Sequence, residues 1–228
     1  MKDGCPNTQG ITIFGVNDNR KTAVLFNPSC KSWNCPHCSQ EKAEQWAWVG
    51  MTGAYQLLER GEMVFCTVTS RPHASVNQSL YFFKQNWPKL RKRIRQKNGG
   101  AFEYMLIPEQ HKTGKLHAHF VANVYIRQKW LKDNAMACGF GYMAKVDSVE
   151  YAQGVAAYMT KYMAKSIAFT DWPKNFRRVR KSQGWPTPEP GQKEQGWNWT
   201  SRQAVLDDEL VALVGAGYTV NDRRKTDI

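Results

Sequence analysis

The segment Glu109–His119 reads Glu-Gln-His-Lys-Thr-Gly-Lys-Leu-His-Ala-His and is the most informative part of this chain. Alternate side chains of a strand point to the same face, so His117 and His119 share one face. The other face receives the apolar residues Leu116, Ala118, Phe120, Ala122 and Val124. The turn signal Thr113-Gly114 separates this run from the strand-like run 103–109, and together they predict a β-hairpin.

The register of this hairpin decides what faces the histidines. If the turn centres near Thr113, Glu109 lies opposite His117, with β-carbons about 4.5–5.5 Å apart. Two imidazoles and a carboxylate would then converge as a divalent-metal site with open coordination positions. A shift of the loop by one residue would instead bring Gln110 or His111 to that position. The alternative interpretation is a solvated strand that happens to carry two polar histidines.

A second chemical signal lies in the run 149–167, which has no proline, a single glycine and many Ala and Met residues. This composition favours a helix. Tyr158 and Tyr162 would lie one turn apart on it, with Lys161 and Lys165 beside them. Lysine is rarely buried unpaired, which argues against both tyrosines being core residues. A tyrosine hydroxyl can act as a covalent nucleophile on a phosphodiester.

These motifs resemble those of a known family. A Thr-rich strand at 65–69, then His-x-His, then Tyr-x-x-Lys is similar to the three motifs of the HUH endonucleases, which initiate rolling-circle replication of small plasmids and single-stranded DNA phages. The doubled Tyr-x-x-Lys is similar to the two-tyrosine initiators of small phages. The resemblance covers about residues 63–168. Ala118 departs from it, because family members often carry a bulkier residue there.

The resemblance implies a mechanism and a set of partners. Mg²⁺ or Mn²⁺ would activate the scissile phosphate, and its expected ligands are His117, His119 and Glu109. Tyr158 would attack first and leave a 5′-phosphotyrosine with a free 3′ hydroxyl, and Tyr162 would act in a second round. Lys161 and Lys165 would stabilise charge or orient the phosphate. The expected partners are unpaired DNA at a replication origin and a host helicase and polymerase, in the bacterial cytoplasm.

Composition agrees with a nucleic-acid partner. The formal charge is +13 and the pI about 9.5, which suit a polyanion. Nine tryptophans among 228 residues offer rings that can stack on unpaired bases. Two basic clusters are candidate DNA-binding groups: Arg91, Lys92, Arg93, Arg95 and Lys97, and further along Arg177, Arg178, Arg180 and Lys181. A solvated charged face is the alternative for either cluster alone.

The amino-terminal region carries a different motif, in which Cys30, Cys35 and Cys38 fall within nine residues and Cys5 lies upstream. The Cys-x-x-Cys pair is typical of a structural Zn²⁺ site, and these four cysteines are the expected ligands. His37 could replace Cys5. A redox pair is the other alternative, although no thioredoxin-like pattern surrounds it. Disulfides are not expected, since the sequence shows no signal peptide.

The patterns predict the order β-α-β-β-α-β-α for the segment that resembles the family, preceded by a helix at 40–59. The expected fold class is α+β, with a central antiparallel sheet and flanking helices. The resemblance implies an HUH/RRM-like, ferredoxin-like arrangement with a small N-terminal zinc-binding segment. Three regions are expected: 1–60, the endonuclease core 61–170, and a basic, Pro/Gly-rich extension 171–228 with a short helix near 204–214. No run is long and apolar enough to span a membrane.

Three other functions are compatible with parts of this pattern. A single-tyrosine HUH transposase shares the chemistry but leaves the second Tyr-x-x-Lys unexplained. A zinc-containing regulator that binds nucleic acid without catalysis leaves the convergence of Glu109, His117 and His119 unexplained. A packaging protein would coat nucleic acid at high stoichiometry, insensitive to chelators.

Overall fold

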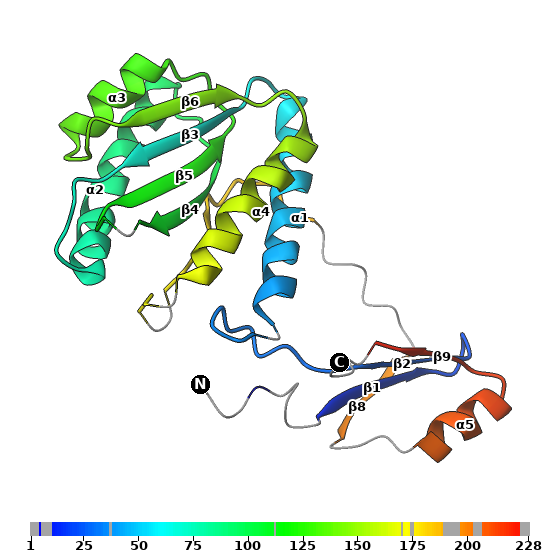
Figure 1. The fold of residues 1–228 in the computed structure, drawn as a ribbon. Coiled ribbons are helices and arrows are strands. Elements are labelled where there is room, and N and C mark those ends of the chain that lie inside the picture. The colour runs from blue at the N-terminus through cyan, green and yellow to red at the C-terminus, as the bar shows by residue number, and fades with distance from the viewer. Residues whose placement is uncertain are drawn as a thin grey trace. The chain divides into compact units, whose positions relative to one another are not determined.

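A computed structural model describes residues 5, 11–36, 38–111, 113–169, 171–173, 176–188, 197–202 and 207–223. The chain divides into two compact units (Figure 1). One comprises Gln40–Pro188, and the other joins Met1–Ser39 with Glu189–Ile228. The sequence analysis had set boundaries near residues 60 and 170, whereas here the two ends of the chain share a unit. Parts of the predicted extension, residues 189–196 and 224–228 among them, lie outside the described residues.

The unit Gln40–Pro188 is built on an antiparallel five-stranded sheet with the order β6-β3-β5-β4-β7. Its strands are β3 (Val64–Thr69), β4 (Tyr104–Gln110), β5 (Leu116–Ala122), β6 (Ala144–Ser148) and β7 (Arg180–Lys181). Its helices are α1 (Ser39–Leu58), α2 (Val76–Lys97), α3 (Gln128–Ala137) and α4 (Ala152–Ala168). From β3 to α4 the element order is the predicted β-α-β-β-α-β-α, and the α+β class is confirmed.

Helices α2 and α3 cover one face of this sheet. Helix α2 begins at Ser75, whose hydroxyl accepts a hydrogen bond from the Gln78 amide at 3.2 Å, as is typical of an N-cap. Its apolar stripe and the inner face of β5 form one core, which includes Phe83, Trp87, Leu90, Ile94, Leu116, Ala118 and Phe120. Since alternate residues of β5 enter this core, His117 and His119 face the opposite side of the sheet.

Helices α4 and α1 lie on that opposite side (Figure 1). The buried apolar positions of α4 are Ala152, Val155, Met159 and Met163. A β-carbon added to Gly50 of α1 would lie 3.2 Å from Met159 and 3.5 Å from Met105, so the backbone of α1 approaches α4 and β4 closely. This packing holds the tyrosine helix against the strand face that carries the histidines. In the described part of the chain, no helix combines the length and apolar character that crossing a membrane requires.

The other unit contains a second sheet with the order β8-β1-β2-β9. Its strands are β1 (Thr12–Asn17), β2 (Thr22–Phe26), β8 (Trp197–Arg202) and β9 (Thr219–Asp222), and β9 runs parallel to β2. Helix α5 (Asp207–Gly215) adds Leu210 and Leu213 to a small core with Phe14, Ala23 and Leu25. The sequence analysis did not predict these strands. The strands are short, and β1 pairs with β8, which lies near the other end of the chain, so no local pattern indicates the pairing.

Candidate active site and metal centre

The β4–β5 hairpin has the register on which the predicted metal site depends. Glu109 lies opposite His117, and Ile107 lies opposite His119. Gly114 in the turn has φ +73°, and a β-carbon there would lie 2.3 Å from the carbonyl oxygen of His73. Glycine is therefore required for both the backbone conformation and the close approach. Neither Gln110 nor His111 occupies the position opposite His117.

Two threonines of β3 hold the imidazoles from the other side. Thr67 pairs with His119 and Thr69 with His117 in the strand register. The Thr67 hydroxyl lies 2.9 Å from Nδ1 of His119, and the Thr69 hydroxyl lies 3.2 Å from Nδ1 of His117. The two rings stay nearly parallel, with centroids 5.9 Å apart. The threonines thus fix both rings through Nδ1. The sequence analysis noted the Thr-rich strand without assigning this role, which alternation at 67 and 69 could have suggested.

Glu109 connects the hairpin to the tyrosine helix. Its Oε2 lies 2.7 Å from Nε2 of His119, and its Oε1 accepts a hydrogen bond from Nζ of Lys165 at 3.0 Å. Burial alone would raise the pKa of Glu109, but the hydrogen bonds and charges of His119 and Lys165 lower it to about 2. Burial, reinforced by the neighbouring His119, lowers the pKa of His117 to about 4. Burial also lowers the pKa of His119, although Glu109 opposes this effect.

An ionised carboxylate and neutral imidazoles are the protonation states that a bound metal ion needs. The mixed nitrogen and oxygen donors suit a divalent ion such as Mn²⁺. Among the described residues, however, the group whose ligand atoms all lie within 4.8 Å of one another is the set of four cysteines described below. The ligand atoms of Glu109, His117 and His119 are less closely grouped. The Thr67 hydroxyl can donate or accept, so it can pair with either tautomer of His119. The donor types therefore fit the predicted ion. Its binding would replace the hydrogen bond between Nε2 of His119 and Oε2 of Glu109.

The two tyrosines occupy different environments. The Tyr162 ring stacks on His119 with centroids 3.6 Å apart and an interplanar angle of 20°. Tyr158 stacks on Phe65, and its hydroxyl donates to the carbonyl of Cys66 at 3.1 Å. Burial raises the pKa of Tyr158 well above its ordinary value. Spacing along the helix does not distinguish the tyrosines. The difference arises from the strand that each ring reaches, because Tyr158 contacts β3 and Tyr162 contacts β5.

Both predicted lysines lie near Tyr162. Nζ of Lys161 lies 5.4 Å from the centroid of the Tyr162 ring, and Nζ of Lys165 lies 5.2 Å from it. Cations at this distance interact favourably with an aromatic ring. Since Lys165 also bonds Glu109, one ammonium group bridges the carboxylate and this tyrosine. The structure therefore brings the histidine pair, Glu109, Tyr162 and both lysines to one side of the sheet.

The four predicted zinc ligands come together in the unit that joins both ends of the chain. The Sγ atoms of Cys5, Cys30, Cys35 and Cys38 all lie within 4.8 Å of one another, and those of Cys5 and Cys38 are 3.7 Å apart. Four sulfurs held at about 2.3 Å by one tetrahedral Zn²⁺ would lie about 3.8 Å apart. Burial raises the pKa of Cys30 to about 12, so this thiol is protonated at neutral pH until a cation displaces its proton. The cluster fits a structural metal such as zinc. The alternative ligand His37 lies outside the described residues.

The two predicted basic clusters differ in exposure. On α2, the side chains of Arg91, Lys92, Arg93, Arg95 and Lys97 are all exposed. In the second cluster, Arg178 is buried and donates to the carbonyl of Ser166 at 2.8 Å, close to the end of α4. The Arg180 guanidinium lies over the rings of Phe83 and Phe176. Half-buried Lys181 donates to the carbonyl of Trp185, whereas Arg177 is exposed. Arg178 therefore supports the fold and does not face a phosphate in this structure.

Comparison with known proteins supports a replication-related class. Residues 63–167 match a family of replication-associated proteins of the ORF2 type, and this segment contains the threonines, the hairpin and both tyrosines. The match supports a replication initiator family. No curated protein matched the chain. A crystal structure of the hypothetical protein ORF119 from Sulfolobus islandicus rod-shaped virus 1 aligns with 59% of this chain and 97% of its own, at 14% identity and a TM-score of 0.33. A likeness this weak adds nothing to the argument.

Proposed function

We propose that this protein is a two-tyrosine HUH endonuclease that starts rolling-circle replication. It would nick single-stranded DNA at an origin and rejoin it through a covalent 5′-phosphotyrosine. One observation carries the proposal: Tyr162 stacks on His119, which Thr67 holds through one ring nitrogen and Glu109 contacts through the other. A nucleophile, a set of metal ligands and a cation from Lys165 thereby meet in one place.

The chain supplies ligands, orientation and charge. His117, His119 and Glu109 would hold Mg²⁺ or Mn²⁺, which acts as a Lewis acid on the scissile phosphate when bound. The phenol oxygen of tyrosine forms a bond to phosphorus and loses its proton to solvent, while the bond from phosphorus to the 3′ oxygen breaks and that oxygen takes a proton from solvent. Lys161 and Lys165 lie where they can stabilise the phenolate. The released 3′ hydroxyl would serve a host polymerase, with a helicase separating the strands, in a bacterial cytoplasm.

The environments of the tyrosines suggest an order of use. The sequence motifs favoured Tyr158 as the first nucleophile. In this structure, however, the Tyr158 hydroxyl donates a hydrogen bond to the Cys66 carbonyl. Tyr162 already contacts the imidazole pair. We therefore propose that Tyr162 attacks first, and that Tyr158 acts in the later joining step after its hydrogen bond to β3 opens.

A gel assay tests both the activity and the order. Purified protein, Mn²⁺ and overlapping single-stranded oligonucleotides from the replicon that encodes the chain are mixed, and covalent adducts are resolved under denaturing conditions. Tyr162→Phe should remove the first adduct, Tyr158→Phe should retain it, and exposed Tyr55→Phe should behave as wild type. The reverse pattern would refute the order. An adduct formed by the doubly substituted Tyr158→Phe, Tyr162→Phe protein would refute the mechanism, and binding without any adduct would favour a non-catalytic regulator.

A further inference from the structure

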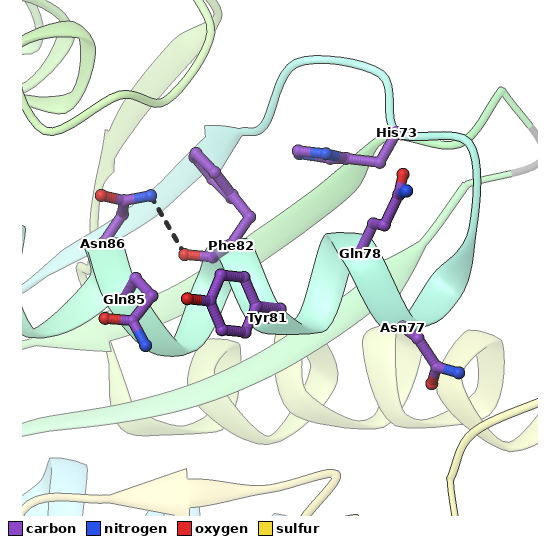
Figure 2. Close-up of a pocket in the computed structure, with 7 residues that line it drawn as sticks. All are labelled: His73, Asn77, Gln78, Tyr81, Phe82, Gln85 and Asn86. Carbon is purple, nitrogen blue, oxygen red and sulfur yellow. Dashed lines mark hydrogen bonds between the residues drawn. The ribbon is translucent and has the colours of Figure 1, made fainter.

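A pocket of about 530 Å³ opens over the first half of α2 and the loop that follows β3 (Figure 2). Four amide side chains, two aromatic rings and His73 line it. None of these lining residues is a lysine, an arginine or a carboxylate. The pocket is therefore formally neutral, with an aromatic, mostly apolar lining that carries a few amide groups, although it belongs to a chain with a formal charge of +13.

Several lining groups have hydrogen-bonding capacity to spare. Nε2 of His73 is buried and has no hydrogen-bond partner among the residues that the structure describes. The His73 ring packs against the Phe82 ring, with centroids 4.9 Å apart. Figure 2 shows the imidazole above α2 with the Gln78 amide nearby. The Gln78 side-chain oxygen accepts from the Ala74 amide, which leaves its NH₂ group for a ligand. Tyr81 is 68% exposed and offers an open ring face.

The pocket is joined to the hairpin that carries the histidines. The carbonyl oxygen of Gly114, in the hairpin turn, accepts hydrogen bonds from the His73 amide at 3.0 Å and from the Ser79 hydroxyl at 3.2 Å. His73 lies four positions after Thr69, the partner of His117, and a chain of that length spans at most about 14 Å. Helix α2 covers the sheet face opposite to the histidines, so a DNA strand that leaves the histidine pair would pass around the hairpin turn to reach this pocket.

We propose that this pocket binds an unpaired base of the DNA strand, a short distance from the scissile phosphate. The inference rests on the proposed function and names a determinant of its substrate. A phosphate would require cations, which the lining lacks, whereas amide and imidazole groups pair with base edges and aromatic rings stack on base faces. Exposed Lys84 and Lys89 lie on the same helix, and Nζ of Lys89 donates to Oδ1 of Asn86, a lining residue, at 3.0 Å, so cations for the DNA backbone lie beside the neutral lining.

Binding measured without chemistry tests this inference. Fluorescence anisotropy without added Mg²⁺ or Mn²⁺, and without a chelator that would remove zinc from the cysteine cluster, compares a labelled mixed-sequence 20-mer with an abasic deoxyribose-phosphate 20-mer of equal charge. Wild type should bind the base-bearing strand more tightly. Tyr81→Ala should weaken binding of that strand about tenfold, the scale of one lost stacking contact, and leave the abasic strand unchanged. Tyr55→Ala is the matched control, because Tyr55 is 64% exposed on α1 of the same unit.

Three outcomes would overturn the inference: equal binding of both strands by wild type, an unchanged preference in Tyr81→Ala, or an equal loss for both strands. A free deoxynucleoside monophosphate that occupies the pocket without competing with the strand would also overturn it, because it would assign the pocket to a free nucleotide. Adduct formation with Mn²⁺ at saturating DNA is measured in parallel. Adducts from Tyr81→Ala would uphold the nuclease proposal whatever becomes of the pocket.

Discussion

The histidine site and the cysteine site of this protein are assembled in opposite ways. Thr67, Thr69 and Glu109 hold the imidazoles through the register of three paired strands, so protein contacts alone orient the rings. The cysteine cluster gathers four sulfurs from segments outside any helix or strand, and the buried residues of its core are three of those cysteines. The imidazole rings of the first site are pre-organised by protein contacts, whereas the cysteine cluster is expected to depend on a bound ion for its order.

The largest expected effect follows from the pre-organised site. Replacing both imidazoles, His117→Ala with His119→Ala, should reduce adduct formation below detection while the sheet remains folded, since two of the three proposed metal ligands are lost. Binding of single-stranded DNA should persist and weaken with added salt. The readouts are the denaturing gel with Mn²⁺ and a circular dichroism spectrum. The exposed His111→Ala is the control, and adducts from the double variant would exclude a metal role for the pair.

Loss of a ligand at the cysteine site should disturb the local fold as well as metal binding. Cys38→Ser should lower bound zinc from about one ion per chain to almost none, because a structural site needs all four ligands. The segment around it should then become sensitive to protease, since metal binding supplies the folding free energy of such segments. Metal analysis and limited proteolysis measure both effects. Cys138→Ser, a buried cysteine outside the cluster, should retain the zinc, and full zinc content in Cys38→Ser would refute the assignment.

The threonines provide a milder test of pre-organisation. Thr67→Val keeps the shape of the side chain but removes the hydroxyl that pairs with Nδ1 of His119. Loss of such a supporting contact typically costs about 10–100-fold in metal affinity or activity. The Mn²⁺ concentration at half-maximal adduct formation should rise by that factor, with a near-wild-type plateau at saturating metal. An unchanged Mn²⁺ dependence would mean that strand pairing alone orients the ring.

The sequence predicted those parts of the molecule that depend on local periodicity. Alternation along 116–124 and the glycine turn predicted the hairpin but left its register open between Glu109, Gln110 and His111. Cysteine spacing predicted the four-sulfur cluster, with His37 open as an alternative to Cys5. Contacts between distant segments were not predictable. The hydroxyl of Tyr158 meets a carbonyl of β3, Arg178 reaches back to Ser166, and β1 pairs with β8. Each depends on how separate elements pack, which neither propensity nor spacing encodes.

The smallest expected effects separate the two basic clusters. Lys92 is exposed on α2, so Lys92→Ala should leave the free energy of unfolding unchanged and lower the slope of log affinity against log salt by about 0.7, the value for one phosphate contact to a single strand.

Arg178 should show the opposite profile. Its side chain is buried against the carbonyl of Ser166, and losing a hydrogen bond from a charged group costs about 1.5–3 kcal/mol. Arg178→Met should therefore lower the free energy of unfolding in urea by about that amount while the salt slope stays at the wild-type value. A changed salt slope with unchanged stability would show that Arg178 leaves its buried position to contact DNA. The basic sequence around it would then mark a binding surface that opens only with the nucleic acid present.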